Sequence, residues 1–464
     1  MYRHAINDLK YWKDKANRKP LVIRGARQVG KTYLVRIFAE TYFKNILEIN
    51  FEKHIEVSDI FKSKNPQKII QLLELQYNQA ITPGETLLFL DEIQAAPEIL
   101  ASLRYFYEEL SDLHIISAGS LLEFALKSPV YSMPVGRLEY LFLGPMQFDE
   151  FLIAMAEDKL FKFIQSYQIQ EPLSETIHNR LMDLFRTYLV TGGMPAPLGA
   201  YIQNQSWQAC EEEKNALLMT FKDDFNKYET KMKNQTHKLQ LIFKKVPLIV
   251  GTKFKYVNIT RNEKPNEIAN ALDMLCMARV VYRVFHSSGT GVPIGATINE
   301  KIFKPLFLDV GMMSSMCGLN LLDFERAEDV LFVNSGAICE QFIGQHLLFS
   351  RHFYQEPELH YWVREKKGAS SEVDYLIAEG SNIIPIEIKA GKTGSLKSLH
   401  MFIKEKQSPL GLRFCSFIPS LFNNEKVLIH NEQISYRLLS LPLYMVGQCR
   451  RMIREILNSE CVNT

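Results

Sequence analysis

Residues 25–32 read Gly-Ala-Arg-Gln-Val-Gly-Lys-Thr, a complete G-x-x-x-x-G-K-T motif. The apolar run 21–23 precedes this motif and the helix-like run 33–38 follows it, which is the strand–loop–helix context that a phosphate loop requires. The two glycines allow the backbone to turn its N–H groups toward a polyphosphate at the positive end of the following helix. The predicted contacts with a nucleoside triphosphate are Gly25, Ala26, Arg27, Gln28, Val29, Gly30, Lys31 and Thr32.

A pair of acidic residues follows the continuous apolar run 86–90, which is typical of a parallel strand buried on both faces. This run ends in Asp91 and Glu92. We predict that Thr32 and Asp91 hold a Mg²⁺ ion and that Lys31 meets the β- and γ-phosphates. Glu92 can polarise the attacking water as the catalytic base. ATP and Mg²⁺ are therefore the predicted cofactors, and ATP hydrolysis is the predicted reaction.

Two further strand-like runs, 45–50 and 114–120, alternate with helical segments. This alternation predicts βαβ units and a mostly parallel sheet, an α/β fold that binds its ligand at the carboxyl ends of the strands. The run 114–120 ends in small polar residues, so Ser117 or Ser120 could sense the γ-phosphate or orient water. The alternative for either serine is an ordinary Ser-Gly turn.

Negative charge on the γ-phosphate in the transition state favours contact with an arginine. Arg27 lies inside the phosphate loop and could point outward, and Arg186 lies in a later helical segment. Arg137 follows a glycine and precedes a strand-like run, and it is the better candidate, within the chain or from a neighbouring subunit. The alternative for each arginine is a surface or helix-capping position.

Together with the phosphate loop, Leu-Asp-Glu-Ile-Gln at 90–94 and Ala-Gly-Ser at 118–120 resemble the prokaryotic AAA-type ATPases. More narrowly, the chain resembles the AAA ATPases whose C-terminal half is a companion domain of unknown function. This resemblance implies an AAA-type core with a helical lid, and it extends to about residue 400. Its further signatures are Gly136-Arg137 with the segment 144–151, Tyr188-Leu189 with the segment 192–195, and a C-terminal hairpin.

The length of 464 residues exceeds what one hydrophobic core usually organises, so several domains are expected. No apolar run approaches the roughly 20 residues that span a bilayer. The seven cysteines are scattered, which indicates reduced thiols, so we predict a cytoplasmic protein without a membrane partner. The net charge of +2 does not decide between nucleic acid and other partners, and a homo-oligomer is compatible with the sequence. The predicted domains are an AAA-type core (1–155), a helical lid (156–235), a winged-helix-like module with a connector (236–330) and a restriction-endonuclease-like α/β domain (331–464).

Helical spacing over 264–275, with Pro265 near the helix start, precedes an alternating run at 278–284. The order helix, helix and β-wing is that of a winged helix, which the resemblance also implies. Its basic residues could contact nucleic-acid phosphates, and the alternative is a module that packs between domains. The basic candidates are Lys253, Lys255, Arg261, Lys264, Arg279 and Arg283.

The C-terminal part carries a second chemical pattern, two strand-like runs at 371–377 and 384–390. Period-two alternation puts Glu387 and Lys389 on one face of the second strand. Asp374 can join them if the two strands pair as a hairpin. Two carboxylates and a lysine at a sheet suit metal-dependent phosphodiester cleavage, in which the metal activates water.

This hairpin resembles the restriction-endonuclease-like fold with its D…E-x-K signature. The resemblance implies a second metal site of Glu340, Asp374, Glu387 and Lys389, whereas the alternative is a set of solvated cross-strand charge pairs. Two classes of function therefore stay open. One is a Mg²⁺-dependent ATPase coupled to binding or cleavage of DNA or RNA. The other is an ATP-switched signalling or scaffold protein whose C-terminal half binds a protein partner.

Overall fold

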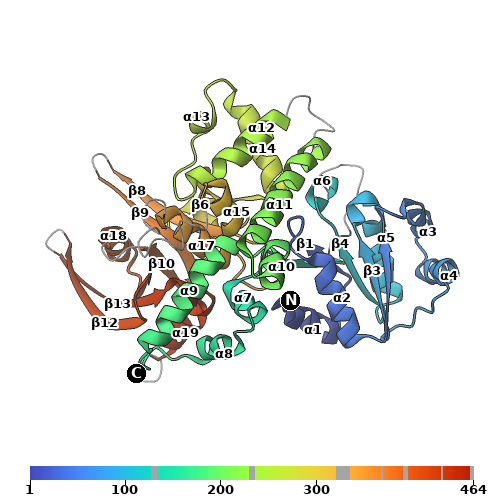
Figure 1. Ribbon diagram of the computed structural model, residues 1–464, viewed down its shortest axis with the longest axis horizontal. Coiled ribbons are helices and arrows are strands. Elements are labelled where there is room, and N and C mark those ends of the chain that lie inside the picture. Colours follow the sequence, from blue (N-terminus) through green and yellow to red (C-terminus); the bar gives the residue numbers. More distant parts are fainter. Residues whose placement is uncertain are drawn as a thin grey trace.

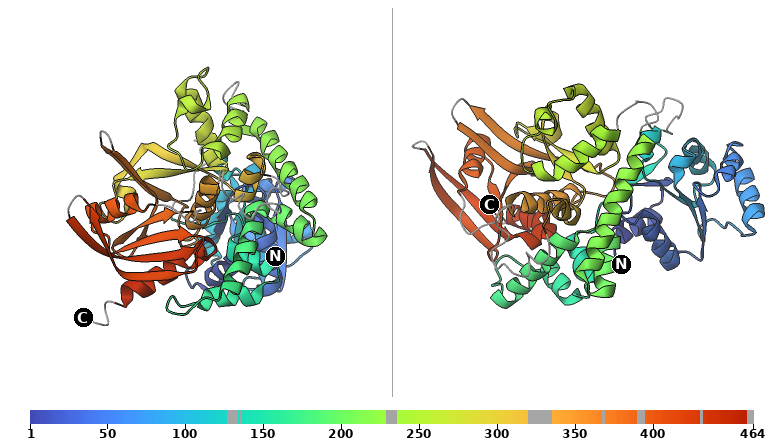
Figure 2. Two further views of the ribbon diagram at one scale, coloured as in Figure 1. Left: turned by 60° about the vertical axis from the view of Figure 1, so that its left-hand side comes forward. Right: turned by 45° about the horizontal axis from the view of Figure 1, so that its top comes forward.

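The computed structural model describes residues 1–126, 134, 136–228, 236–319, 335–366, 369–389, 395–429 and 432–459. The described chain contains a five-stranded sheet in its N-terminal part and an eight-stranded sheet in its C-terminal part. Figure 1 and the two views of Figure 2 place these sheets on opposite sides of a helical middle segment. The predicted α/β fold class is confirmed.

The N-terminal sheet is parallel throughout, with strand order β2-β3-β4-β1-β5. Its strands are β1 (Leu21–Arg24), β2 (Asn45–Asn50), β3 (Thr86–Asp91), β4 (His114–Ala118) and β5 (Glu139–Phe142). Its helices are α1 (Ala5–Asp14), α2 (Lys31–Tyr42), η1 (Ile55–Val57), α3 (Ser58–Phe61), α4 (Pro66–Tyr77), η2 (Ile93–Ala95), α5 (Ile99–Glu109) and α6 (Leu122–Leu126). Because the strands are parallel, their carboxyl ends meet at one edge, which is where such sheets bind ligands.

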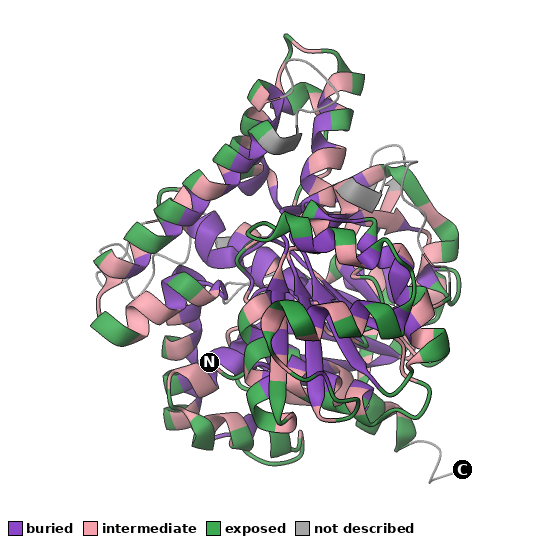
Figure 3. Cartoon of the chain, turned by 90° about the vertical axis from the view of Figure 1, so that its right-hand side faces the viewer, coloured by how far each residue is buried: buried purple, intermediate pink, exposed green. Residues whose placement is uncertain are grey.

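Both faces of this sheet are covered. Leu21 and Ile23 belong to one hydrophobic cluster, whereas Val22 between them belongs to another. Every residue of β3 is buried. Figure 3 shows buried residues along the central strands and exposed residues on the outer sides of the helices. Burial on both faces explains why the sequence shows continuous apolar runs here rather than alternation.

The middle segment consists of helices joined by turns and loops in its described part. Its helices are α7 (Phe148–Ala154), α8 (Asp158–Ser166), α9 (Glu175–Thr191), α10 (Pro195–Asn204) and α11 (Trp207–Tyr228). Helix α9 ends before Gly192, which has a φ of +71°. A Cβ on Gly192 would lie 2.1 Å from Asp309 Oδ1, and the N–H of Gly193 donates to Asp309 Oδ2 at 2.7 Å. The glycine pair is therefore a close contact between the helical segment and the C-terminal half.

A second group of helices leads into the C-terminal sheet. It consists of α12 (Thr236–Lys245), η3 (Val246–Ile249), α13 (Tyr256–Ile259) and α14 (Pro265–Met277), followed by β6 (Val281–Ser287), η4 (Ile294–Thr297) and β7 (Ile298–Phe307). Strands β6 and β7 form an antiparallel hairpin, but β6 also pairs in parallel with a later strand, with Val284 opposite Leu359. The eight-stranded sheet thus crosses the predicted boundary at residue 330. The winged-helix-like module and the domain boundaries stay predictions.

The C-terminal sheet is mixed, with strand order β12-β13-β11-β10-β9-β8-β6-β7. Its remaining strands are β8 (Leu359–Lys366), β9 (Ala369–Glu379), β10 (Asn382–Ile388), β11 (Leu410–Cys415), β12 (Ser420–Ile429) and β13 (Glu432–Pro442). Its helices are α15 (Val310–Met316), α17 (Ser335–Leu348), α18 (Lys397–Lys406), η6 (Leu443–Gln448) and α19 (Cys449–Asn458). Strands β9 and β10 form the expected antiparallel hairpin, with Ile386 opposite Tyr375, and the register between β8 and β9 shifts after His360.

The N-terminal and C-terminal halves share one hydrophobic core cluster, and hydrogen bonds also join them. The N–H of Phe148 in α7 donates to His346 Nε2 in α17 at 2.8 Å. The N–H of Phe142 at the end of β5 donates to Phe353 O at 3.0 Å. The N-terminal sheet therefore contacts the C-terminal half directly as well as through the helical middle segment.

Among the described helices, none has the length and apolar character to cross a membrane. Six cysteines lie in the described ranges, and each of these six is a free thiol. Cys461 lies outside those ranges.

Candidate nucleotide site and buried charge cluster

The phosphate loop joins β1 to α2 through backbone conformations that only certain residues adopt readily. Gln28 and Gly30 have positive φ values of 65° and 91°. A Cβ on Gly25 would lie 2.2 Å from Leu143 O, so the chain after β5 leaves room only for glycine. Helix α2 begins at Lys31, which gives the last residues of the loop the unpaired N–H groups of a helix N-terminus.

Lys31 lies inside this loop and is only 8% exposed. Its Nζ donates to Gly25 O at 3.1 Å and to Ala26 O at 2.8 Å. Burial lowers the pKa of Lys31 to about 8, although the nearby carboxylates of Glu92 and Glu123 act to raise it. Phosphate oxygens are stronger acceptors than carbonyls for an ammonium, so they can replace these two contacts.

The hydroxyl of Thr32 donates to both carboxylate oxygens of Asp91, at 3.1 and 3.3 Å. Burial, and then the charge of Glu92, raise the pKa of Asp91 to about 6. Hydroxyl and carboxylate oxygens are the hard donors that Mg²⁺ prefers. This pair therefore fits the metal ion that accompanies a nucleoside triphosphate.

Glu92 follows β3 in a left-handed conformation, with a φ of 51°. Gln94 Nε2 donates to Glu92 Oε2 at 2.6 Å, and the Ser120 hydroxyl lies 3.5 Å from the same oxygen. These contacts hold the carboxylate at the carboxyl edge of the sheet. The Ser117 hydroxyl instead donates to Leu21 O at 3.3 Å within the sheet, so the structure favours Ser120 of the two candidate serines.

Two arginines connect the phosphate loop to other segments. Arg3 is buried, and its Nη1 donates to Val29 O at 2.8 Å while its Nε binds Glu150 Oε1 at 3.2 Å. Arg27 forms a short ion pair with Asp224 in α11. The predicted loop residue Arg27 therefore points toward the helical segment, and it connects the loop to that segment electrostatically.

A pocket of about 670 Å³ opens beside the loop. Gln28 and Gly30 belong to the loop wall, and Pro195 to the wall formed by α10. This volume lies within the usual range for small-molecule sites. The other lining residues are Met1, Arg3, Tyr33, Met146, Ala196, Gly199, Ala200, Gln203, Asn204 and Glu213.

Arg137 lies at the opposite edge of the sheet. It precedes β5, and β5 runs parallel to β1 with Leu21 opposite Glu139, so Arg137 lies where these strands begin and the loop lies where they end. Its Nε forms an ion pair with Glu108 at 2.9 Å. A phosphate contact from Arg137 within one chain is therefore not supported, whereas a contact with a neighbouring subunit stays a prediction. Arg186 forms an ion pair within α9 at 2.5 Å.

The hairpin residues of the predicted second site do lie together. Lys389 Nζ binds Glu387 Oε1 at 2.6 Å, which agrees with their predicted common face. Asp374 Oδ2 accepts a hydrogen bond from the N–H of Ile388 at 2.7 Å. The charge of Asp374 also contributes to the raised pKa of Glu387, so the two carboxylates are close neighbours.

Lys304 of β7 is an additional member of this cluster. Its side chain is 1% exposed, and its Nζ lies 2.5 Å from Glu340 Oε1 and 3.0 Å from Glu372 Oε1. The rings of Tyr361 and Tyr375 face the ammonium, with centroids at 4.9 and 5.5 Å. Burial acts to lower the pKa of Lys304, but the surrounding carboxylates raise it well above its ordinary value. The ammonium is therefore charged.

Burial raises the pKa of Glu340 and of Glu387 to about 7, and it raises that of Asp374 as well. Glu387 Oε2 is buried and has no hydrogen-bond partner among the residues that the structure describes. Within those residues, no group of three or more His, Cys, Asp or Glu side chains is arranged to hold a metal ion. The predicted residues Glu340, Asp374, Glu387 and Lys389 thus lie in a charge cluster that also contains Lys304, and the second metal site stays a prediction.

Two of the expected nucleic-acid contacts are engaged internally. Arg279 is 8% exposed at its side chain and binds Glu123 Oε1 at 2.9 Å and Glu356 Oε1 at 2.7 Å. Arg283 forms an ion pair with Asp273. The prediction that Arg279 contacts phosphates of a nucleic acid is therefore wrong, because burial and two ion pairs occupy its guanidinium.

Sequence reasoning missed four residues of these sites. Lys304 carried a readable signal, because a lysine inside an apolar strand-like run is seldom buried without a partner. Gln94 lies in the motif at 90–94, two residues after Glu92, but no role was predicted for it. Arg3 and Asp224 had no local signal, since their loop partners are 26 and 197 residues away.

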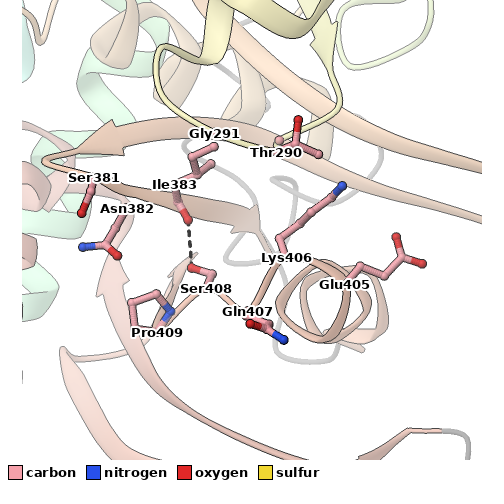
Figure 4. Close-up of a pocket in the computed structure, with 11 residues that line it drawn as sticks. Thr290, Gly291, Ser381, Asn382, Ile383, Glu405, Lys406, Gln407, Ser408 and Pro409 are labelled. Atoms are coloured by element: carbon pink, nitrogen blue, oxygen red, sulfur yellow. Dashed lines mark hydrogen bonds between the residues drawn. The ribbon is translucent and has the colours of Figure 1, made fainter.

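A smaller pocket, of about 330 Å³, lies in the C-terminal half (Figure 4). The Ser408 hydroxyl donates to Ile383 O at 2.8 Å in its wall. None of its lining residues belongs to the nucleotide site or to the charge cluster. They are Gly289, Thr290, Gly291, Ser381, Asn382, Ile383, Glu405, Lys406, Gln407, Ser408 and Pro409.

Family models match three successive parts of the chain. An AAA domain matches residues 17–152, which include the phosphate loop, Asp91 and Glu92. A domain of unknown function (DUF8612) matches residues 182–323, and another (DUF4143) matches residues 335–430. No curated protein matches the chain.

Three solved structures are similar to the chain at 12% sequence identity each. C. elegans PCH-2 has a TM-score of 0.26, with 45% of this chain and 66% of that chain covered. A STAND protein with a tetratricopeptide repeat sensor, PH0952 from Pyrococcus horikoshii, has a TM-score of 0.25 and coverages of 75% and 45%. The Aeropyrum pernix ORC2 protein, in ADPNP–ADP complexes, has a TM-score of 0.22 and coverages of 68% and 91%. The chain thus spans less than two thirds of the first two proteins.

Proposed function

We propose that this chain, which carries an AAA domain followed by two domains of unknown function, hydrolyses ATP with Mg²⁺ and so controls contacts of its C-terminal half. The AAA domain at residues 17–152 supports the binding of ATP. The observation that carries the proposal is the convergence of Lys31, Thr32, Asp91 and Glu92 at the carboxyl edge of one parallel sheet.

Each of these side chains has a distinct task in the proposal. Lys31 exchanges its two loop carbonyls for oxygens of the β- and γ-phosphates. Thr32 and Asp91 hold Mg²⁺, which neutralises phosphate charge when it is bound. Glu92 accepts a proton from the attacking water, and Gln94 orients its carboxylate for that transfer.

The base and ribose are assigned to the pocket of about 670 Å³ beside the loop. Its walls come from the phosphate loop and from α10, so one ligand would contact both the core and the helical segment. The ion pair between Arg27 and Asp224 adds a second connection between these parts. The predicted lid, whose described helices include α9 to α11, would therefore change position with the nucleotide.

For the C-terminal half, we favour binding of a partner over cleavage of a nucleic acid. The specific observation is the ammonium of Lys304, which binds Glu340, one of the carboxylates that cleavage would require for metal, and the neighbouring Glu372. A protein partner fits the scaffold alternative, and DNA or RNA stays a candidate ligand.

ATP turnover by the full chain tests the first part of the proposal. We expect turnover with Mg²⁺ and none with EDTA. Glu92→Gln should bind ATP normally and turn over at least a hundredfold more slowly, since removing a general base costs about 10²–10⁴ in rate. Glu98→Gln, at a nearby exposed glutamate, should match the wild type. A wild-type rate in Glu92→Gln would refute the role of Glu92, and ATP binding without any turnover would refute hydrolysis.

The same assay with duplex DNA, single-stranded DNA or RNA separates the two kinds of partner. Nucleic-acid binding that weakens steeply with salt and changes the turnover rate would favour a nucleic-acid partner. An unchanged rate, with no binding at low salt, would favour the protein-partner alternative.

A further inference from the structure

The charge cluster of the C-terminal half collects acidic side chains from three elements. Glu340 comes from α17, Glu372 and Asp374 from β9, and Glu387 from β10. Three of these, Glu340, Asp374 and Glu387, are largely buried and raised in pKa by that burial. Buried carboxylates need a cation, because leaving their charge unpaired away from water is costly.

One buried cation satisfies most of this need. Lys304 Nζ contacts both Glu340 and Glu372. The charge of Asp374 helps to raise the pKa of Lys304, and the charge of Lys304 acts to lower the pKa of Glu387. The faces of two tyrosine rings hold the ammonium from other directions, as a cation–π contact does. Lys389 is more exposed, at 28%, and contacts Glu387 at the margin of the cluster.

We propose that Lys304 is the resident cation of this cluster and occupies the place that a divalent metal ion would need among Glu340, Asp374 and Glu387. A metal ion placed among these carboxylates would compete with the ammonium for Glu340 Oε1, and two cations so close would repel each other. The cluster therefore holds its acidic groups together without metal. Glu387 Oε2, which is buried and has no hydrogen-bond partner among the described residues, is an oxygen that a metal ion could use once the ammonium is removed.

Loss of the lysine should destabilise the cluster. Lys304→Met removes the charge but keeps a similar length, so the acidic oxygens are left without their cation. Its melting temperature should fall by roughly 10 °C, as expected for a broken buried ion pair. Mn²⁺, a hard cation suited to carboxylate ligands, should restore most of this loss in a saturable way. The wild type should show no comparable shift.

Lys214→Met is the matched control, because Lys214 is also 1% exposed and forms an ion pair with Glu211 at 2.6 Å. It lies on α11 with a single carboxylate partner, so its loss should lower the melting temperature without rescue by Mn²⁺. Adding Asp374→Asn to Lys304→Met should abolish the rescue. If Lys304→Met does not fold, Lys304→Gln allows the same comparison.

Electron paramagnetic resonance of Mn²⁺ with the nucleotide-free full chain gives the second measurement. We expect a bound-Mn²⁺ signal in Lys304→Met that Asp374→Asn removes. The proposal would be overturned by wild-type Mn²⁺ binding that Asp374→Asn abolishes. It would equally be overturned if neither Lys304 variant gained Mn²⁺ binding, since the ammonium would then not be what excludes the metal.

Discussion

The pH dependence of ATP affinity should report the buried state of Lys31. In the nucleotide-free protein, burial lowers the pKa of Lys31 to about 8, so its ammonium is lost as the pH rises above that value. Bound phosphates favour the charged form, and ATP binding at high pH must therefore take up a proton. With a free pKa of about 8, linkage predicts that affinity falls about tenfold between pH 7 and pH 9.

Substitution of Lys31 shows how much ATP affinity this side chain contributes. Two hydrogen bonds to charged phosphates contribute about 1.5–3 kcal/mol each, so Lys31→Met should lose roughly 10²–10⁴ in affinity at pH 7. Because methionine does not titrate, its affinity should stay level, and the gap to wild type should shrink about tenfold by pH 9. Lys31→Arg keeps its charge throughout this range and is the control for charge without titration.

Fluorescence titration with a labelled, non-hydrolysable ATP analogue at saturating Mg²⁺ measures these affinities. A constant ratio between wild type and Lys31→Met from pH 7 to pH 9 would refute the reasoning, because Lys31 would then remain charged in the free protein. A parallel decline in Lys31→Arg would refute it too, by assigning the pH effect to another group.

Three further outcomes follow from the geometry. The pKa of Asp91 is raised to about 6, and a protonated carboxyl cannot bind metal, so the Mg²⁺-dependent part of ATP affinity should be nearly full at about pH 7 and above and fall by up to about tenfold per unit well below pH 6. Titrations from pH 5 to pH 8 with and without Mg²⁺ check this, and Asp91→Asn should remove the trend. Gln94→Ala should lower ATP turnover about tenfold or more at unchanged ATP affinity, because the Glu92 carboxylate loses a 2.6 Å hydrogen bond. A loss of ATP affinity as large as the loss of turnover would contradict this role of Gln94. Gly192→Ala should lower the melting temperature more than Gly318→Ala. Both glycines have a positive φ, but only at Gly192 would the added Cβ lie 2.1 Å from an atom of Asp309. Equal shifts in melting temperature would show that this clash relaxes without cost.

Much of the nucleotide site was predictable because its information is local. The loop residues 25–32 and the strand end at Asp91 follow from glycine positions and a continuous apolar run. The parallel arrangement then brings both to the same edge of the sheet. The hairpin that pairs Glu387 with Lys389 is equally local, since it depends on period-two alternation and a turn at Gly380.

Strand order decides the position of Arg137 relative to the phosphate loop, which the sequence did not reveal. Arg137 lies before β5 and the phosphate loop lies after β1, and because these strands are parallel, the two positions are at opposite edges. Nothing in the spacing of the sequence reveals that β5 is a direct neighbour of β1. The position of Arg279 was equally hidden from the sequence, because its partner Glu123 lies 156 residues away. The expected surface cation is instead buried in an ion pair with Glu123.

The sequence by itself therefore determined the parts whose chemistry is carried by neighbouring residues: the phosphate loop, the acidic end of β3, and the acidic hairpin. Only the tertiary structure decided which charges meet across elements. Lys304 on β7 enters a cluster made by α17, β9 and β10, with Glu372 at a separation of 68 residues. The physical reason is that periodicity specifies the face on which a side chain lies, whereas its counterion depends on sheet order and helix placement. That difference explains why Lys304, which is distant in sequence, joins the predicted acidic residues in one cluster.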